Sequence, residues 1–408
     1  MEKISQTQKG SLFGAILLVS GCCIGAGMLG IPVLSAMAGF KPSVLLFILS
    51  WLFMTATGLL LLEVNLLFKD EVNIVSMASR TLGFVGKAIA WSVFLCLFYS
   101  LMVAYGAASG ELFVDFTKDL TGIILPNWLG ILIMVGIFGV MVYLGTQAVD
   151  NFNRVLMFGL IATYVLLVSL GVSYVKTDYL QHSNWDAALF MIPVLIVSFG
   201  YHNLVPSLTK YLDYDAKRLR LCFIIGGAIP LLVYLTWEYL ILGLVPLEGP
   251  DGFLATRDNG DMATKALKAA VGSPLIVGLA HYFAFFAVVT SFIGVALSFV
   301  DFLADGLGIS KGPKGRFQMC LLALFPPFIF AVLYPKIFLD ALNIAGGYFA
   351  VILFGILPAL MAWSARYVLK LKNTYRVPGG RILLTVVILI SLMVIGIQLT
   401  NDLAWVPR

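Results

Sequence analysis

The sequence predicts an all-α integral membrane protein with eleven transmembrane helices, and three observations lead to this fold class. Hydrophobic residues make up 61% of the 408-residue chain and charged residues 12%, whereas soluble domains have about 45–50% and about 25%. The apolar residues gather in runs of ~20 or more, the length that crosses a bilayer. Glycine and proline interrupt two of these runs. This composition excludes an ordinary soluble enzyme, a disordered chain and a nucleic-acid-binding protein.

Eleven stretches have the length and apolar character of membrane spans. They are residues 11–39, 42–68, 86–115, 128–148, 152–174, 186–209, 218–243, 273–305, 316–335, 336–363 and 381–400. Polar and turn residues separate them, as at Lys69-Asp70-Glu71. The longest loop, 244–272, is too short to fold alone, so we expect a single membrane domain over residues 1–408.

The basic residues predict how the chain crosses the membrane. With the N-terminus in the cytoplasm, most Lys and Arg residues fall in the segments that are then inside, including the clusters at 210–220 and 366–381. This is the bias that sets orientation in membrane proteins. With eleven spans the C-terminus then lies outside. The five cysteines lie in apolar runs without C-x-x-C spacing, so we expect no disulfide framework and no metal site.

The first and sixth spans differ from the others. The first reads SGCCIGAGMLGIP, with four glycines before Pro32, and the sixth reads MIPVLIVSFGYHNLVPSL, with Pro193 and Pro206 around a polar centre. Proline removes a backbone donor and clashes with the preceding turn, and glycine costs about 1 kcal/mol relative to alanine inside a helix. We therefore expect unwound backbone in the middle of both spans.

The two interruptions predict an inverted repeat. Spans one and six are an odd number of helices apart, so they cross in opposite directions, and such a pair is typical of transporters with a binding site near the midplane. We expect a first five-helix repeat over 11–174, an inverted second repeat over 186–363 and an extra helix at 381–400. The alternative is close helix packing through small residues.

Unwound helices of this kind offer the groups that bind an amino acid. Free N–H groups at a half-helix N-terminus attract a carboxylate, and freed carbonyls accept from an ammonium or coordinate a cation. No arginine lies near the middle of any predicted span, which argues against large anionic substrates such as nucleotides. No P-loop follows any span, so we expect an ion gradient as the energy source and neither enzymatic activity nor a cofactor.

Four motifs resemble one transporter family. GCCIGAGMLGIP is similar to the G-x-x-I-G-[AS]-G-[ML]-L-x-[IL]-P signature of the hydroxy and aromatic amino acid permeases, within the wider amino acid–polyamine–cation group. SFGYHNLVPSLTKYL, VVTSFIGVALSFVDFLAD and AYGAASGE resemble further segments of that family, in order along essentially the whole chain. The chain most resembles the bacterial tyrosine-specific permeases.

The resemblance implies a function and a set of contacts. It implies import of an aromatic amino acid, foremost tyrosine, by cation symport through alternating access in the bacterial inner membrane, usually with protons. The alternatives are tryptophan or another hydroxy or neutral amino acid, and sodium. The implied substrate contacts are Gly25, Ala26 and Gly27 for the carboxylate and Ser198, Phe199 and Gly200 around the ammonium and ring.

Three further residues are candidates for the lining of the site. Tyr99 and Tyr105 lie in the central third span, but six residues turn about 600° at 3.6 residues per turn, so at most one faces the site. Tyr99 is the candidate substrate contact, and core packing is its alternative role. Asn343 precedes two glycines that interrupt the tenth span and is expected on the other side of the pocket.

Two groups are candidates for ion coupling. His202 is an ionisable side chain near mid-span, where such residues are usually functional, and its alternative role is a neutral cap. Thr290 and Ser291, with carbonyls near Gly21 and Ile24, offer oxygen ligands for sodium. Alternatively, these hydroxyls bond to their own helix.

The acidic residues near span ends, including Glu63, Glu111 and Glu238, are shallow enough to reach headgroup water. We expect them to be gate or loop contacts, and proton relay is their alternative role.

Overall fold

The computed structural model describes residues 10–68, 72–309, 312–372 and 375–404. Among these residues, ten helices are long and apolar enough to cross a membrane, and a bent helix pair brings the number to eleven. The predicted fold class is therefore confirmed. The separators Lys69-Asp70-Glu71 lie outside the described residues, and the division into two repeats stays a prediction.

The first span consists of two helices bent by 53°. Helix α1 (Leu12–Cys23) begins at Ser11, whose side chain accepts a hydrogen bond from the backbone N–H of Gly14, and it ends at Ile24, which has an extended backbone with ψ 96°. Helix α2 (Gly27–Ser35) then starts in a new direction and contains Pro32. The predicted break is confirmed at residues 24–26.

The sixth span is built from short pieces. These are α7 (Trp185–Ala188), α8 (Ile192–Ser198) and α9 (Val205–Tyr211), with 3₁₀ turns between them. Prolines occupy the first turns of α8 and α9, where their missing N–H costs no helical hydrogen bond. The helix is interrupted from Phe199 to Tyr201, both of which have non-helical backbone angles, so this predicted break is confirmed as well.

The remaining spans are long helices. They are α3 (Phe40–Asn65), α4 (Ile74–Thr121), α5 (Asn127–Leu144), α6 (Thr146–Gly171), α10 (Ala216–Leu244), α13 (Pro274–Leu307), α14 (Pro313–Leu333), the tenth span from α15 (Phe338–Ile344) to α16 (Leu357–Trp363), and α17 (Gly380–Ala404). Helices α11 (Phe253–Asp258) and α12 (Ala263–Ala270) fold in the longest loop.

Two spans differ from the sequence prediction. Helix α4 starts twelve residues before the predicted 86, because a capping box at Asn73 begins a helical segment that joins the span at Gly83, where φ is +72°. Only glycine adopts that conformation freely. The tenth span was expected to be interrupted at Gly346, but it continues through wide π-helical turns at Ala345–Ala350 and Ile352–Ile356. A Cβ on Gly346 would lie 1.8 Å from the carbonyl oxygen of Pro193, so glycine there permits close packing on α8.

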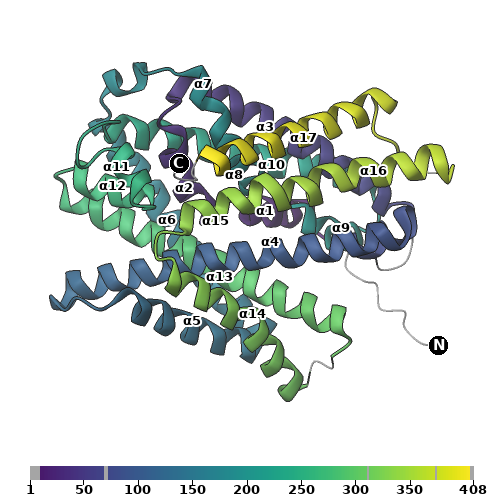
Figure 1. The fold of residues 1–408 in the computed structure, drawn as a ribbon, viewed down its shortest axis with the longest axis horizontal. Helices are drawn as coiled ribbons and strands as arrows, with labels where there is room; N and C mark the ends of the chain where they lie inside the picture. The colour runs from purple at the N-terminus through teal and green to yellow at the C-terminus, as the bar shows by residue number, and fades with distance from the viewer. Residues whose placement is uncertain (1–9, 69–71, 310–311, 373–374, 405–408) are drawn as a thin grey trace.

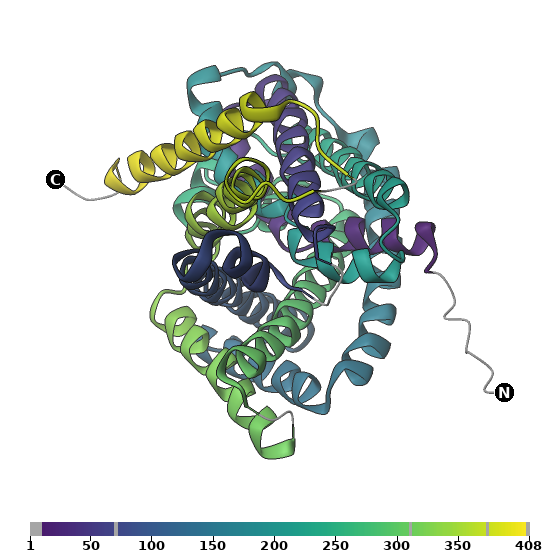
Figure 2. The ribbon, with the colours of Figure 1, turned by 90° about the vertical axis from the view of Figure 1, so that its right-hand side faces the viewer.

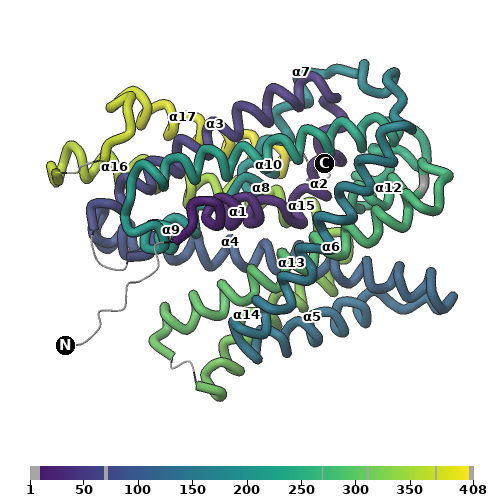
Figure 3. Tube along the Cα trace, turned by 180° about the vertical axis from the view of Figure 1, so that it is seen from behind, coloured from purple at the N-terminus to yellow at the C-terminus, as the bar shows by residue number. Residues whose placement is uncertain are grey.

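The helices form a bundle with both broken spans at its centre. Helices α5, α13 and α14 lie on one side of α4, and α3, α16 and α17 lie on the other (Figure 1). The view along the helices shows the same two groups around the middle of the molecule (Figure 2). From behind, α1 and α2 lie beside α8 and α10 (Figure 3). Helices α11 and α12 mark one end of the bundle and α9 marks the other (Figure 1).

Candidate functional site

The two broken spans touch each other at their breaks. The Cys22 sulfur lies 3.6 Å from the carbonyl oxygen of Gly200 and 3.9 Å from Oδ1 of Asn203. Farther along, a Cβ added to Gly27 would lie 2.7 Å from the Ser198 hydroxyl oxygen. The structure thus brings the predicted carboxylate contacts of the first span next to the predicted ammonium contacts of the sixth.

Tyr234 of α10 joins the two breaks. Its fully buried hydroxyl lies 2.5 Å from the carbonyl oxygen of Cys23 and 2.9 Å from that of Ser198. A tyrosine hydroxyl has one hydrogen, so it can donate to only one of these carbonyls at a time. The sequence does not single out Tyr234, because the seventh span has no break and its tyrosines resemble ordinary core residues.

The start of α2 is the predicted carboxylate site. The backbone N–H of Ala26 donates to the Ser291 hydroxyl at 2.9 Å, so this predicted contact has a protein partner in the present conformation. A Cβ on Gly25 would lie 2.2 Å from the same hydroxyl. Glycine at 25 and at 27 therefore lets α13 and α8 approach the backbone of the first break.

The Ser198 side chain is the least satisfied polar group at the breaks. Its hydroxyl is buried and has no hydrogen-bond partner among the described residues. An unpaired buried group of this kind costs about 1–3 kcal/mol. A hydroxyl both donates and accepts, so this position suits the carboxylate or the ammonium of a bound amino acid.

The neighbouring residues of the sixth break shape an apolar wall. The Phe199 ring is 1% exposed and meets the Tyr234 ring edge-on, with centroids 5.1 Å apart. A Cβ on Gly200 would lie 2.9 Å from the carbonyl oxygen of Val197 and 3.1 Å from the Phe354 ring. Side chains are therefore excluded at 200, and Phe199 provides the aromatic surface of this break.

His202 is completely buried just after the sixth break. Its Nε2 lies 2.9 Å from the Thr57 hydroxyl, and its ring stacks on Phe354 at 4.7 Å and on Tyr201 at 5.1 Å. In the described part of the chain, Nδ1 has no partner. The histidine is fixed in place between aromatic rings, and no acidic side chain forms a salt bridge with it there.

The predicted sodium ligands lie at the first break. The Thr290 hydroxyl lies 2.8 Å from the carbonyl oxygen of Phe286 and 3.1 Å from that of Ala287, so it donates within its own helix. The Ile24 N–H donates to the carbonyl of Ser20 at 3.0 Å, and a Cβ on Gly21 would meet Met157 of α6 at 3.5 Å. Thr290 thus behaves as helical hydroxyls often do, while Ser291 faces the break.

Tyr99, a predicted substrate contact, lies away from the breaks. The Tyr99 hydroxyl donates to the carbonyl of Leu322 in α14 at 3.0 Å, and its ring packs on Phe299. Tyr105, its neighbour along α4, is 8% exposed and lies within electrostatic reach of Cys22. The two tyrosines thus have different neighbours, and the one nearer the first break is Tyr105.

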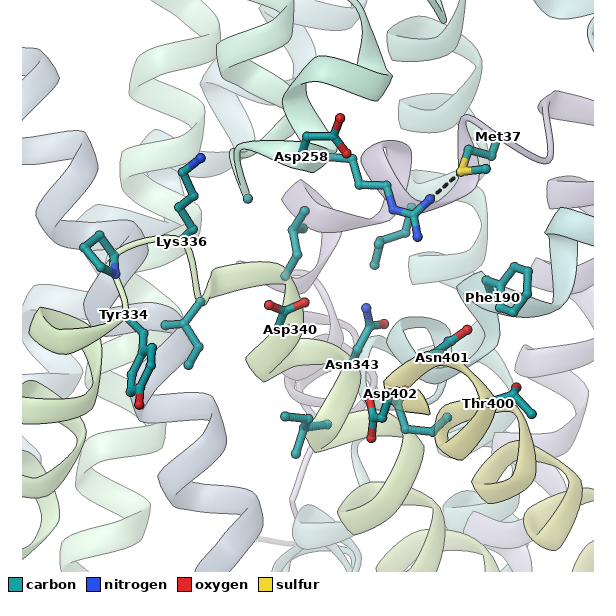
Figure 4. A pocket seen from close by; sticks show the side chains of 18 of the residues that line it. Met37, Phe190, Asp258, Tyr334, Lys336, Asp340, Asn343, Thr400, Asn401 and Asp402 are labelled. Carbon is teal, nitrogen blue, oxygen red and sulfur yellow. Dashed lines mark hydrogen bonds between the residues drawn. The ribbon is translucent and has the colours of Figure 1, made fainter. Parts of the chain in front are cut away.

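Asn343 lines a separate cavity of about 1050 Å³ at the end of the bundle that holds α11. The cavity lies between the ends of α2 and α17 and the start of α15. Figure 4 shows Asn343 near Asp340, Asn401 and Asp402, with Lys336 and Tyr334 farther along the wall. None of the residues at the two breaks lines it.

A second cavity of about 470 Å³ lies at the opposite end, beside α9. Its walls include Asn203 and Pro206 of the sixth span, Asn65 at the end of α3 and Phe302 of α13. Since Asn203 also approaches the Cys22 sulfur, this cavity reaches the edge of the breaks from one side only.

Two glutamates expected near headgroup water are buried. Glu63 forms a buried ion pair with Arg366, whose Nε lies 2.7 Å from Oε1, and Oε2 accepts from the backbone N–H of Val377 at 2.6 Å. This pair joins α3 to the end of the tenth span. Glu238 is 0% exposed. The expected contact with headgroup water is therefore not made by either carboxyl group, because neighbouring helices cover these ends of the spans.

Comparison with known proteins places these features in a family context. The pattern of the Tryptophan/tyrosine permease family matches residues 8–398. The "Tyrosine-specific transport system 1" of Haemophilus influenzae is 33% identical over 397 residues, covering 97% of this chain and 98% of the relative. The "Tryptophan-specific transport protein" of the same organism is 29% identical over 412 residues, covering 98% of each.

A solved structure has the same fold. The crystal structure of MhsT in complex with L-phenylalanine superimposes with a TM-score of 0.67 and covers 94% of this chain and 98% of that chain. The sequence identity is 14%, so this likeness concerns the fold alone.

Proposed function

Because the chain belongs to the tryptophan/tyrosine permease family, we propose that it imports tyrosine into the cytoplasm by proton symport. As a member of this family it is a multi-pass membrane transporter of an aromatic amino acid, tyrosine or tryptophan, and not an enzyme. The choice of tyrosine, the coupling ion, the inner membrane and the direction of transport are the parts that we propose.

The observation that carries the proposal is the contact between the two breaks. The N-terminal end of α2 at Gly27 lies against the unpaired Ser198 hydroxyl, with Phe199 beside it. The carboxylate of the substrate binds the start of α2, where N–H groups and the helix dipole favour an anion. The ammonium binds the oxygens of the sixth break, and the ring packs on Phe199.

Tyrosine is favoured over tryptophan by the relatives. Relatives named for tyrosine are 33%, 30% and 26% identical, while relatives named for tryptophan are 28–30% identical over most of the chain. This difference is small, so tryptophan is the second candidate substrate. The apolar surface of Phe199 and the core around Tyr105 suit either ring.

Proton coupling is favoured by the resemblance of the sequence motifs, which implies protons. At the candidate sodium ligands, the Thr290 hydroxyl donates within its own helix and Ser291 accepts from Ala26. Each hydroxyl oxygen keeps at least one lone pair, so these contacts leave both able to bind a sodium ion. Sodium stays the alternative, with Thr290 and Ser291 as its ligands, and His202 is the proton site that the sequence suggests.

The proposed orientation puts the N-terminus in the cytoplasm and the C-terminus outside. The cavity beside α9 then opens toward the cytoplasm, since α9 and the end of α3 lie on that side. The cavity that contains Asn343 lies on the outer side. The conformation described is therefore one in which the breaks are approached from the inside.

The test is uptake by the purified protein in proteoliposomes. Labelled tyrosine is offered with an imposed pH gradient or a sodium gradient, and all twenty amino acids are tested as competitors. We expect concentrative tyrosine uptake with the pH gradient alone, and competition by aromatic amino acids only. Stronger uptake of tryptophan would reassign the substrate, and uptake that stops when choline replaces sodium would reassign the ion.

A further inference from the structure

Glu238 is a carboxylic acid enclosed inside a membrane span. It lies on α10, roughly 9 Å before the end of the helix at a rise of ~1.5 Å per residue, and it is 0% exposed. Its Oε1 contacts the Ser35 hydroxyl of α2. Its Oε2 is buried and finds no hydrogen-bond partner among the described residues.

The contacts of Ser35 indicate which form of Glu238 fits. The Ser35 hydroxyl also lies 3.3 Å from the carbonyl oxygen of Pro32 in its own helix. A serine hydroxyl has one hydrogen and two lone pairs. Both contacts are hydrogen bonds at the same time only when Ser35 donates to Pro32 and the carboxyl group of Glu238 donates to Ser35. The protonated form of Glu238 therefore makes one more hydrogen bond with these groups than the carboxylate does.

Among the residues that the structure describes, no cation forms an ion pair with Glu238. The basic groups on the elements packed against α10 are exposed or pair with other residues. Lys41 is exposed. The ion pairs are Arg154 with Asp150, Lys265 with Glu111 and Lys268 with Asp119. Near the end of α2, Arg257 and His182 contact Met37.

The acidic, phenolic and thiol groups on those elements are engaged elsewhere or exposed. Glu63 pairs with Arg366, Tyr164 donates to the carbonyl of Val233, and Tyr179 contacts Lys176. The Cys22 thiol contacts Gly200 at the breaks, and Tyr174 and Asp178 are exposed. A buried carboxylate without a partner is strongly unfavourable in a membrane protein, so the group is neutral in this conformation.

We propose that Glu238 is the binding site of the transported proton. Its carboxylate takes one proton from water on the outer side, is enclosed in the neutral form, and returns the proton to water on the inner side. Only an O–H bond forms and breaks, so no other reactant is needed. This inference rests on the proposed proton symport and adds the residue that carries it out.

Glu238 and His202 differ in the charge that they have when they hold a proton. A proton makes glutamate neutral but makes histidine a cation. An enclosed site without a counter-charge therefore favours the loaded form of the glutamate and disfavours that of the histidine. Both side chains are fully buried here without an opposite charge. Glu238 is thus the group that can hold the proton while it is buried away from water on both sides.

Helix α2 links this proton to the substrate. Tyr234, Trp237 and Glu238 lie on one face of α10, since they are three and four residues apart. Trp237 donates to the carbonyl of Met28 at 2.9 Å, and Glu238 contacts Ser35. Gly27 and Ser35 are roughly 12 Å apart along α2. Substrate at one end of α2 and the proton at the other therefore bias the position of the same helix.

The experiment compares two transport modes in proteoliposomes. Glu238→Gln mimics the protonated acid but cannot release a proton, so we expect at least a tenfold loss of tyrosine accumulation driven by a pH gradient, with counterflow exchange of labelled for unlabelled tyrosine retained. The exposed Glu248→Gln on the following loop is the matched control and should behave like the wild type in both modes. Gradient-driven accumulation by Glu238→Gln would overturn the assignment.

A second variant keeps the test decisive if Glu238→Gln loses both modes. Ser35→Ala preserves the carboxyl group and removes its neighbour, so the pH midpoint of uptake should move, whereas the exposed Ser298→Ala on α13 should leave it in place. An unmoved midpoint in Ser35→Ala would refute the role of Glu238. Failure of the proposed function is distinguishable, because then the wild type itself accumulates no tyrosine with a pH gradient, whether or not it retains counterflow exchange.

Discussion

Gly27 and Ser198 lie so close together that a methyl group on the first would sit 2.7 Å from the hydroxyl oxygen of the second. The two residues come from spans an odd number of helices apart, and each lies beside a break. In the proposed function, the ligand touches both broken spans at this contact.

The first prediction concerns the space at Gly27. A leucine there would displace Ser198 and block the start of α2, so Gly27→Leu should abolish tyrosine binding. Scintillation proximity binding on purified protein measures this, together with monodispersity in detergent. Gly136→Leu on α5 is the control, because no neighbouring atom lies within 4 Å of a Cβ at Gly136. Unchanged affinity in a monodisperse Gly27→Leu protein would place the site elsewhere.

The second prediction concerns the unpaired hydroxyl of Ser198. Removing a buried polar group that has no partner is neutral or stabilising for the fold, whereas the ligand loses a hydrogen bond. Ser198→Ala should therefore keep or raise the thermal midpoint of the unliganded protein and weaken tyrosine binding about fivefold or more, as a loss of roughly 1 kcal/mol implies. A lower midpoint with normal affinity would make Ser198 structural.

The third prediction concerns Tyr234, where the opposite pattern holds. Tyr234→Phe removes the only hydrogen that serves the carbonyls of Cys23 and Ser198 among the described residues. We expect a loss of stability of about 1–3 kcal/mol, seen as a lower thermal midpoint, together with weaker binding. Tyr282→Phe on the exposed face of α13 is the control. Equal midpoints for both variants would contradict the bridging role.

The fourth prediction concerns Phe199. Its ring lies edge-on to Tyr234 in the sixth break, and aromatic pairs contribute about 0.5–1.5 kcal/mol beyond area burial. Phe199→Ala should weaken tyrosine binding several-fold and affect a small aliphatic competitor less. Competition binding with both ligands measures the difference. Equal losses for the two ligands would mean that the ring supports the fold only.

The fifth prediction concerns the buried ion pair of Glu63 and Arg366. Arg366→Ala leaves Glu63 buried without its cation, which typically costs about 3–5 kcal/mol. The thermal midpoint should fall markedly, while Arg376→Ala, an exposed position on the same segment, should change it little. A midpoint like that of the wild type would show that the pair adds nothing to stability.

The pattern of the sequence was enough to predict the spans and both breaks, because span length and glycine or proline content are local properties. It was not enough to predict which side chains meet. The spacing of Tyr99 and Tyr105 shows that they face different ways, but only the packing of α4 on α14 shows that Tyr99 points away from the breaks. The two glycines after Asn343 suggested a place in the site, but Gly346 packs against α8 and Gly347 against Gln398 of α17.

Burial by distant parts of the chain explains why Glu238 does not contact water as expected. Glu238 lies near the end of an apolar helix, and its position along the chain suggested contact with water. In the folded protein the end of α2 covers it through Ser35, and α3 also packs against α10. Coverage of this kind depends on neighbours more than 200 residues away, such as Ser35, so no local pattern reveals it.

Where the two broken spans meet, the hydroxyl of Tyr234 supplies one hydrogen for two carbonyl groups. It reaches the carbonyls of Cys23 and Ser198 but satisfies only one at any moment. When the breaks move apart, as alternating access requires, the tyrosine keeps one partner and gives up a contact that was half made. Separating the two breaks therefore breaks at most one full hydrogen bond of Tyr234. A low free-energy cost of this kind allows the conformational change to recur in each transport cycle.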